Sequence, residues 1–197
     1  MGKGKRTYVQ TARRMLQEKT RQRIVEAIVA LHQELGPKNT TIAAIAKRAG
    51  VQRLTVYRHF EDENAMFLAC SGHWISQNPP PDEGEWETIK AFPKRVQAAL
   101  NSIYQYYART APMLSKIYRD ADEVAALGPI VQGVDQHFTT IADNLSTHLS
   151  GGRSNHELKA TARHLVRFAT WQSLSEEGLT NRKMAQVGWK CLRALAR

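Results

Sequence analysis

The chain has 197 residues, 42% of them hydrophobic, and a formal net charge of +10. That length suits a small domain joined to a larger one. No run approaches the roughly 18 consecutive apolar residues that cross a bilayer, and the N-terminus lacks the apolar core of a secretory signal. These features argue against a membrane protein. The two isolated cysteines, Cys70 and Cys191, favour a reducing, cytoplasmic setting.

Residues 1–19 form a basic N-terminal arm with a single acid, Glu18. We expect residues 1–8 to be disordered on their own and residues 9–19 to extend the following helix on binding. Basic arms reach into the minor groove or along phosphates. The alternative is a solvated tail that only aids solubility. The basic residues of the arm are Lys3, Lys5, Arg6, Arg13, Arg14 and Lys19.

The positive charge is confined to the first third of the chain. Residues 1–60 hold 13 Lys or Arg and 3 acids, a balance of +10, whereas residues 61–197 hold 15 of each. A basic segment beside a neutral one is typical of nucleic-acid binding. Membrane-surface binding is the competing interpretation. Membrane binding is the weaker interpretation, because we expect the apolar stripe that begins at Ile24 and Ile28 to pack against neighbouring helices and not against lipid.

Residues 20–76 have the pattern of a helix-turn-helix domain. A helix over about 20–35 precedes a short one that Thr41 caps and Gly50 ends, since a hydroxyl accepts from free N–H groups and glycine tolerates the left-handed conformation. A second short helix runs from Gln52 to about His59. It has little apolar surface, so the first helix must hold it in place. In this layout the second helix reads base edges in the major groove.

The same stretch resembles the DNA-binding domain of the tetracycline-repressor (TetR) family over residues 20–70. The resemblance implies a DNA-binding transcriptional regulator that acts as a dimer and responds to a small molecule bound among its central helices. The matching positions are Thr41, Ile45, Ala46, Ala49, Gly50, Val51, Thr55, Val56, Tyr57, His59, Phe60, Asp62, Met66 and Phe67.

Three positions depart from the family pattern. Gln52 stands where a small hydroxyl residue is usual, so we expect a poorer cap on the second short helix. Leu54 stands where the family often has Gly or Ala, and an apolar side chain there suits a thymine methyl. Glu63 stands where a lysine commonly meets a phosphate, so no phosphate contact is expected at Glu63.

From these positions we predict the DNA contacts. Arg53 and Thr55, together with Gln52 and Leu54, are expected to face bases, and Arg58 serves either bases or phosphates. The residues expected to meet phosphates are Thr41, Lys47, Tyr57 and His59.

Residues 77–197 are predicted to form a larger helical regulatory and dimerisation domain. The prolines of 77–85 favour an extended linker. Helices are expected over about 87–109, from Pro112 to Arg119, over 129–149, over about 155–177 behind a Ser154–Glu157 capping box, and over about 181–196 behind Thr180. With strand signals nearly absent, the predicted fold is all-α.

The last two of these helices, about 155–177 and 181–196, are expected to form the homodimer interface. The apolar arc of the first is broader than one side of a small domain needs, and Gly188 and Ala194 would let a partner helix come close. Pairing of the two helices with their copies is what the TetR resemblance implies. Burial within one chain is the alternative.

Aromatic residues of the C-terminal part are candidates for an effector pocket, although aromatics at helical spacing are more often core. Acids are few there, so a largely apolar or aromatic ligand is expected. The candidates are Trp86, Phe92, Tyr104, Tyr107, Tyr118, Phe138 and Trp171.

No sequence feature predicts catalysis. We find no nucleotide-binding glycine motif, no metal-ligand cluster and no nucleophile–base arrangement, so no cofactor and no catalytic residue is expected. The main hypothesis is a homodimeric regulator, most simply a repressor, of a palindromic DNA operator. The alternatives are an adaptor that keeps the fold but binds a protein through the Gln52–Leu54 surface, and a helical enzyme whose site is assembled from distant residues.

Overall fold

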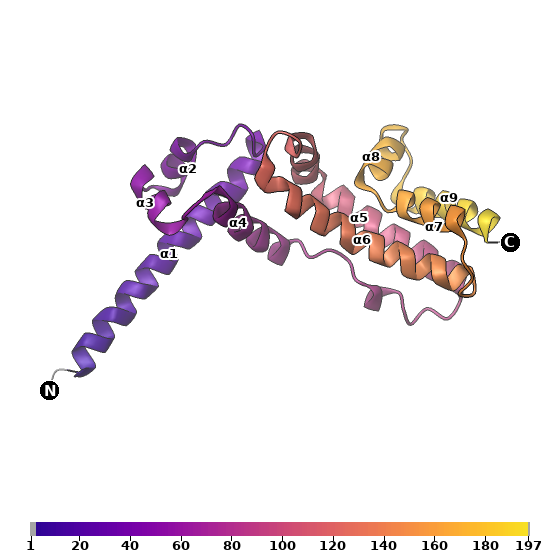
Figure 1. Cartoon of the computed structure of the whole chain (residues 1–197), viewed down its shortest axis with the longest axis horizontal. Coiled ribbons are helices and arrows are strands. Elements are labelled where there is room, and N and C mark those ends of the chain that lie inside the picture. Colours follow the sequence, from indigo (N-terminus) through magenta and orange to yellow (C-terminus); the bar gives the residue numbers. More distant parts are fainter. Residues whose placement is uncertain (1–2, 197) are drawn as a thin grey trace. The chain divides into compact units, whose positions relative to one another are not determined.

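The computed structural model describes residues 3–196, with the side chains of residues 3–7 and 9 left out (Figure 1). Over this range the chain contains helices and turns and no strand, which confirms the predicted all-α fold. The chain divides into two compact units. The first comprises the residues up to Asn78 together with Ser115–Ile130, and the second comprises Pro79–Leu114 and the residues from Val131 onward.

The first unit is built around the C-terminal half of α1 (Lys3–Leu35). Beside this half lie α2 (Ile42–Ala49), α3 (Arg53–His59) and α4 (Glu63–Gln77), while the N-terminal half of α1 runs away from them (Figure 1). Of residues 1–8, expected to be disordered on their own, residues 3–8 are the first turns of α1, and residues 1–2 lie outside the described residues. The buried core of this unit includes Ile24, Val25, Ile28, Leu31, Ile45, Ala46, Val56, Phe60 and Phe67.

The helix ends follow from their capping residues. The Thr41 hydroxyl accepts from the Ala44 N–H at 3.2 Å at the start of α2, and Gly50 ends that helix with φ of +66°. Gln52 makes no side-chain capping bond at the start of α3, as its departure from the family pattern predicts. Asp62 caps α4 by accepting from the Ala65 N–H at 2.7 Å. The two short helices are therefore joined in the predicted helix-turn-helix geometry.

Residues 115–130 close the first unit. Leu127, in the short 3₁₀ segment Ala125–Leu127, is fully buried in the core of that unit. The buried Asp120 carboxylate accepts from the Arg119 guanidinium at 2.7 Å and from the Lys38 backbone N–H at 3.1 Å. The pKa of Asp120 is held below its usual value, first by the Arg119 hydrogen bond, with desolvation opposing it. This segment therefore ties the loop after α1 to the rest of the unit.

The second unit contains most of α5 (Phe92–Asp120) and α6 (Gly128–Leu149), and the whole of α7 (His156–Leu165), α8 (Phe168–Glu176) and α9 (Asn181–Leu195). The prediction of separate helices over 87–109 and 112–119 is wrong, because α5 is continuous with Pro112 inside it. Pro112 and Ala108 are both exposed. Proline has no N–H to donate to the carbonyl of Ala108, four residues earlier in the helix, so this exposed carbonyl can accept a hydrogen bond from water instead.

The helix predicted over 155–177 is in fact two helices. The Tyr104 hydroxyl donates to the Leu165 carbonyl at 2.9 Å, and the Tyr107 hydroxyl donates to the Val166 carbonyl at 2.6 Å. The Leu165 and Val166 carbonyls therefore have hydrogen-bond partners outside the helix, and the helix can end after α7 and begin again as α8. The N-cap of α7 is Asn155, whose side chain accepts from the Leu158 N–H at 2.9 Å, and not Ser154.

Gly188 lies inside this unit rather than on a partner-facing surface, so its expected role in the dimer is wrong. It is buried, and a Cβ built on it would stand 2.7 Å from Leu100 Cδ1 and 3.4 Å from Leu165 Cδ1. Glycine is needed because α9 approaches α5 and α7 of the same chain closely. Ala194, in contrast, is exposed.

We therefore expect Gly188→Ala to lower the free energy of unfolding by about 1–3 kcal/mol, the usual cost of overpacking a core. Urea denaturation of the variant and the native protein measures this difference in the free energy of unfolding. Ala194→Ser, on the exposed side of the same helix, is the control and should change little. An unaltered stability for Gly188→Ala would contradict the close approach to Leu100.

No helix among the described residues is long and apolar enough to span a lipid bilayer.

Candidate nucleic-acid interface

The third helix of the first unit presents its polar residues outward. Val56 is fully buried and Phe60 is 3% exposed, so these two side chains fix α3 on the core. Gln52, Arg53 and Leu54 are exposed at the N-terminal end of the helix. This is the end that contacts base edges in a helix-turn-helix docked in the major groove.

Leu54 and Tyr57, each 58% exposed, are apolar or aromatic side chains that α3 does not bury. Such exposure costs free energy in water unless a partner covers the side chain. A thymine methyl is a fitting partner for Leu54. The exposed position of Tyr57 leaves its hydroxyl free to reach a phosphate.

The expected phosphate contacts from α2 are also accessible. Thr41 and Lys47 are exposed, and the Thr41 hydroxyl, which accepts from Ala44, still has its own proton to donate. Arg48 is engaged within the protein, because its guanidinium donates to both carboxylate oxygens of Glu34 at 2.8 and 2.6 Å. That pairing lowers the pKa of Glu34 and leaves Lys47 as the α2 cation available to a ligand.

A groove of about 600 Å³ lies between the middle of α1 and α3, within the first unit. From α3 it is lined by Thr55, Arg58 and His59. Thr55 and His59 are half-buried, so these side chains face the groove more than open solvent. The residues that line it from α1 are Arg13, Arg14, Leu16, Gln17, Glu18, Thr20 and Arg21.

This groove was not predicted from the sequence, although a signal for it exists. Arg13, Gln17 and Arg21 are spaced four residues apart, and residues at that spacing share one face of a helix. We considered the arm and the recognition helix separately, whereas the structure brings Arg13 and Arg14 beside Arg58. The result is one basic surface that continues from α3 along α1.

The start of α4 has the opposite charge. Glu61, Asp62 and Glu63 are all exposed, and only Asp62 has a structural task, as the cap of α4. The position expected to lack a phosphate contact, Glu63, therefore lies in an acidic patch.

The effector-pocket candidates pack mostly as core. The Tyr107 ring contacts Phe138 at 5.2 Å, Phe168 at 5.4 Å and Trp171 at 6.1 Å between centroids. Trp86 and Tyr104 are also fully buried, whereas Phe92 is half-buried and stacks on His148 at 6.1 Å. Tyr118 belongs to the first unit.

Metal binding has no support in the described part of the chain. No group of three or more His, Cys, Asp and Glu residues is arranged there to hold an ion. Cys70 is buried and Cys191 is exposed, and both are free thiols. Burial raises the pKa of the Cys70 thiol to about 11, so it is an unreactive core residue.

A capped helix-turn-helix with an exposed recognition helix, in a chain with a helical second unit, places the protein in the class of helix-turn-helix proteins. Residues 24–70 match the family model described as "Bacterial regulatory proteins, tetR family". This match covers the helix-turn-helix segment, as the resemblance predicted, and the relatives compared with the chain are named as transcriptional regulators.

Individual relatives agree with this assignment. The transcriptional regulator SrpR of Pseudomonas putida is 30% identical over 112 residues, which cover 54% of this chain and 49% of SrpR. The chain spans half or less of the length of the curated relatives it matches.

Two solved structures from Pseudomonas aeruginosa share the fold over nearly the whole chain. A transcriptional regulator superposes with a TM-score of 0.67 at 15% identity, covering 91% of each chain. NalD, described as the secondary repressor of a multidrug efflux pump, has a TM-score of 0.59 at 17% identity and covers 91% of this chain and 94% of its own.

Proposed function

We propose that this protein is a homodimeric regulator that binds a palindromic DNA operator through α3 and represses transcription until a small molecule releases it. The observation that carries the proposal is the exposed N-terminal end of α3, where Arg53 stands free of any ion pair in the described part of the chain. Net positive charge on the first 60 residues supplies the attraction to phosphates.

The contacts divide into two kinds. Arg53 and Thr55, with Gln52 and Leu54 beside them, read bases, since arginine binds guanine O6 and N7 in a bidentate way. Phosphates are met by Thr41, Lys47, Tyr57 and His59, and the groove beside α1 adds Arg58 to the same surface. Phosphate contacts fix the register, and base contacts give the sequence preference.

A dimer follows from the geometry of DNA. Two recognition helices must reach successive major grooves about 34–36 Å apart, which one head cannot do. We assign the interface to the helices after residue 155 on the strength of the family. In the described structure their apolar residues Leu158, Leu165 and Trp171 are buried within the chain, so exposed residues of α7 and α9 would supply the contact.

The effector is assigned to the second unit, among Trp86, Tyr104, Tyr107, Phe138 and Trp171. The Tyr107 ring contacts the rings of Phe138 and Trp171, so a ligand placed between them would have to separate side chains that now touch. A largely apolar or aromatic molecule fits such walls. A reporter gene placed behind the operator tests repression, and its induction tests release.

The deciding experiment is selection of random duplex DNA on the full chain at near-physiological salt, with light scattering to measure the oligomer. A palindrome bound by a dimer is the expected result. If nothing is enriched and binding vanishes as salt rises, only phosphate attraction is present, and the protein-binding adaptor becomes the better hypothesis.

The basic arm gives a separate prediction. Arg13→Ala/Arg14→Ala should weaken binding to all sequences and reduce the slope of log affinity against log salt by about 2, because each lost phosphate contact removes close to one released counterion. Fluorescence anisotropy at several salt concentrations measures the slope. Lys90→Ala/Lys94→Ala, which removes two exposed charges from the second unit, is the matched control. An unchanged slope would show that the arm is a solvated tail.

A further inference from the structure

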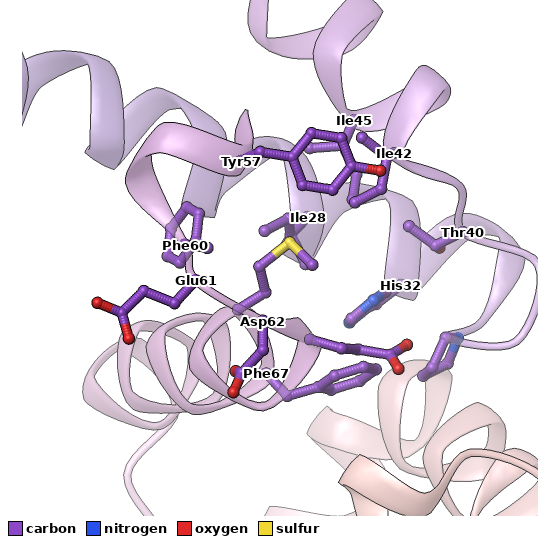
Figure 2. A pocket seen from close by; sticks show the side chains of 13 residues that line it. Ile28, His32, Thr40, Ile42, Ile45, Tyr57, Phe60, Glu61, Asp62 and Phe67 are labelled. Carbon is purple, nitrogen blue, oxygen red and sulfur yellow. The ribbon is translucent and has the colours of Figure 1, made fainter. Parts of the chain in front are cut away.

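A second cavity, of about 240 Å³, lies within the helix-turn-helix head, between α3 and the helices that support it (Figure 2). It is formed entirely by residues of the first unit and is distinct from the groove beside the arm. A dry cavity of about 150 Å³ is large enough for benzene, so this one accepts an aromatic ring with a short side chain. Its apolar walls are Ile28, Ile42, Ile45, Phe60, Met66 and Phe67.

His32 gives the cavity a hydrogen-bond acceptor. The side chain is 5% exposed and its ring stacks on Phe67 at 5.0 Å. The Cys70 thiol donates to the Phe67 carbonyl at 3.2 Å and its sulfur lies 3.9 Å from His32 Nδ1, so we assign the ring proton to Nδ1. Nε2 then carries the lone pair. Because burial lowers the pKa of His32 to about 4, the ring is neutral at pH 7 and the lone pair stays available.

Nε2 opens into this cavity. Among the described residues, no hydrogen bond to Nε2 occurs. In the same residues, every side-chain nitrogen or oxygen that is fully enclosed by protein does have a hydrogen-bond partner. Nε2 is therefore not sealed in the core, and the space that His32 lines is the cavity. An acceptor that faces a mostly apolar cavity favours a ligand that brings a donor.

The charge of the residues that line the cavity indicates what kind of ligand would bring this donor. Glu61, Asp62 and Glu63 are among the thirteen lining residues, and none of the thirteen is Lys or Arg. Glu61 and Glu63 form no ion pair in the described part of the chain. Three carboxylates around an apolar cavity attract a cation and repel an anion.

We propose that this cavity binds a small organic ammonium ion, with a compact aryl or branched alkyl group against the apolar walls and an N–H donated to His32 Nε2 in the field of the three carboxylates. Tyr57 lines the same cavity and is an expected phosphate contact. Figure 2 shows its ring across the cavity from Phe67. The site would thus add a second small-molecule input, in the head itself, and its existence does not depend on the proposed DNA binding.

Phenethylammonium is the probe, added to the full chain with ¹³C-labelled Ile and Met methyl groups and followed by NMR. We expect saturable shifts at Ile28, Ile42, Ile45 and Met66, and affinity about tenfold higher than for 2-phenylethanol, its neutral analogue. The anion phenylacetate should not bind. No shift at these methyls, or equal binding of the alcohol, would overturn the proposal.

Charge-removing variants complete the test. Glu61→Gln/Glu63→Gln should weaken phenethylammonium binding about tenfold, because both residues line the cavity and their charges attract a cation. Both side chains are exposed, so their loss should not unfold the head. Glu26→Gln removes an exposed acid of α1 that does not line the cavity and should leave the affinity unchanged. Equal affinities for the double variant and the native protein would refute the role of the carboxylates. The readout needs no DNA, so failure here and failure of operator binding are distinguishable.

Discussion

The free energy of unfolding should fall by about 3 kcal/mol between pH 6.5 and pH 4 on account of His32 alone. Burial lowers the pKa of this histidine from 6.5 to about 4, and the charge of Asp120 opposes the shift only in part. In that window the unfolded chain binds the proton and the folded chain does not. Stability therefore rises with pH, is complete above pH 6.5, and is lost as the pH falls.

Urea denaturation across this pH range isolates the contribution when His32→Phe is compared with the native protein. Phenylalanine keeps the ring that stacks on Phe67 but has no proton to gain. The variant should show a flatter pH dependence. His156→Phe, which replaces an exposed histidine, is the control and should retain the native slope. A His32→Phe profile parallel to the native one would show that His32 does not remain neutral in the fold.

Replacing Arg53 with alanine should have the largest effect on DNA recognition. We expect a loss of about 1–3 kcal/mol on the preferred operator and a loosened base preference at one position of each half-site, because a bidentate contact to guanine is removed. Tyr57→Phe should instead weaken binding to all sequences alike, since a phosphate contact carries no base information. Repeating the random-duplex selection with each variant separates the two effects.

Arg48→Ala provides the matched control in the same head. Its guanidinium is engaged by Glu34 in two hydrogen bonds, so its removal should leave the selected sequence unchanged. If Arg53→Ala selected the same sequence as the native protein, the assignment of Arg53 to base reading would be wrong. If Arg48→Ala altered the selected DNA sequence, the ion pair between Arg48 and Glu34 would have to break when the protein binds DNA.

The head could be predicted closely because its signals are local. Thr41 caps and Gly50 ends α2 through backbone groups only a few residues away, so the sequence carries the information. Similarly, Thr180 caps α9 by accepting from the Lys183 N–H at 3.3 Å, and that helix begins where it was expected.

Three of the failures involve partners distant in the chain. The break after Leu165 depends on hydroxyls of Tyr104 and Tyr107, some 60 residues earlier, which no local pattern reveals. The sequence predicts Gly188 as a partner-facing residue because its contact with Leu100 exists only in the packed fold. The cavity around His32 could not be foreseen for the same reason, because its walls come from four helices.

The length of the first helix bears on how much DNA the protein covers. Residues 3–20 of α1 lie ahead of the buried core of the head, and at about 1.5 Å per residue they span about 27 Å. Base pairs rise about 3.4 Å each, so an arm laid along the duplex passes about eight of them. The stretch of DNA that the protein shields from nuclease would then be longer than its recognition sequence. Two neighbouring operators would have to be far enough apart for the arms of both bound proteins to fit between them.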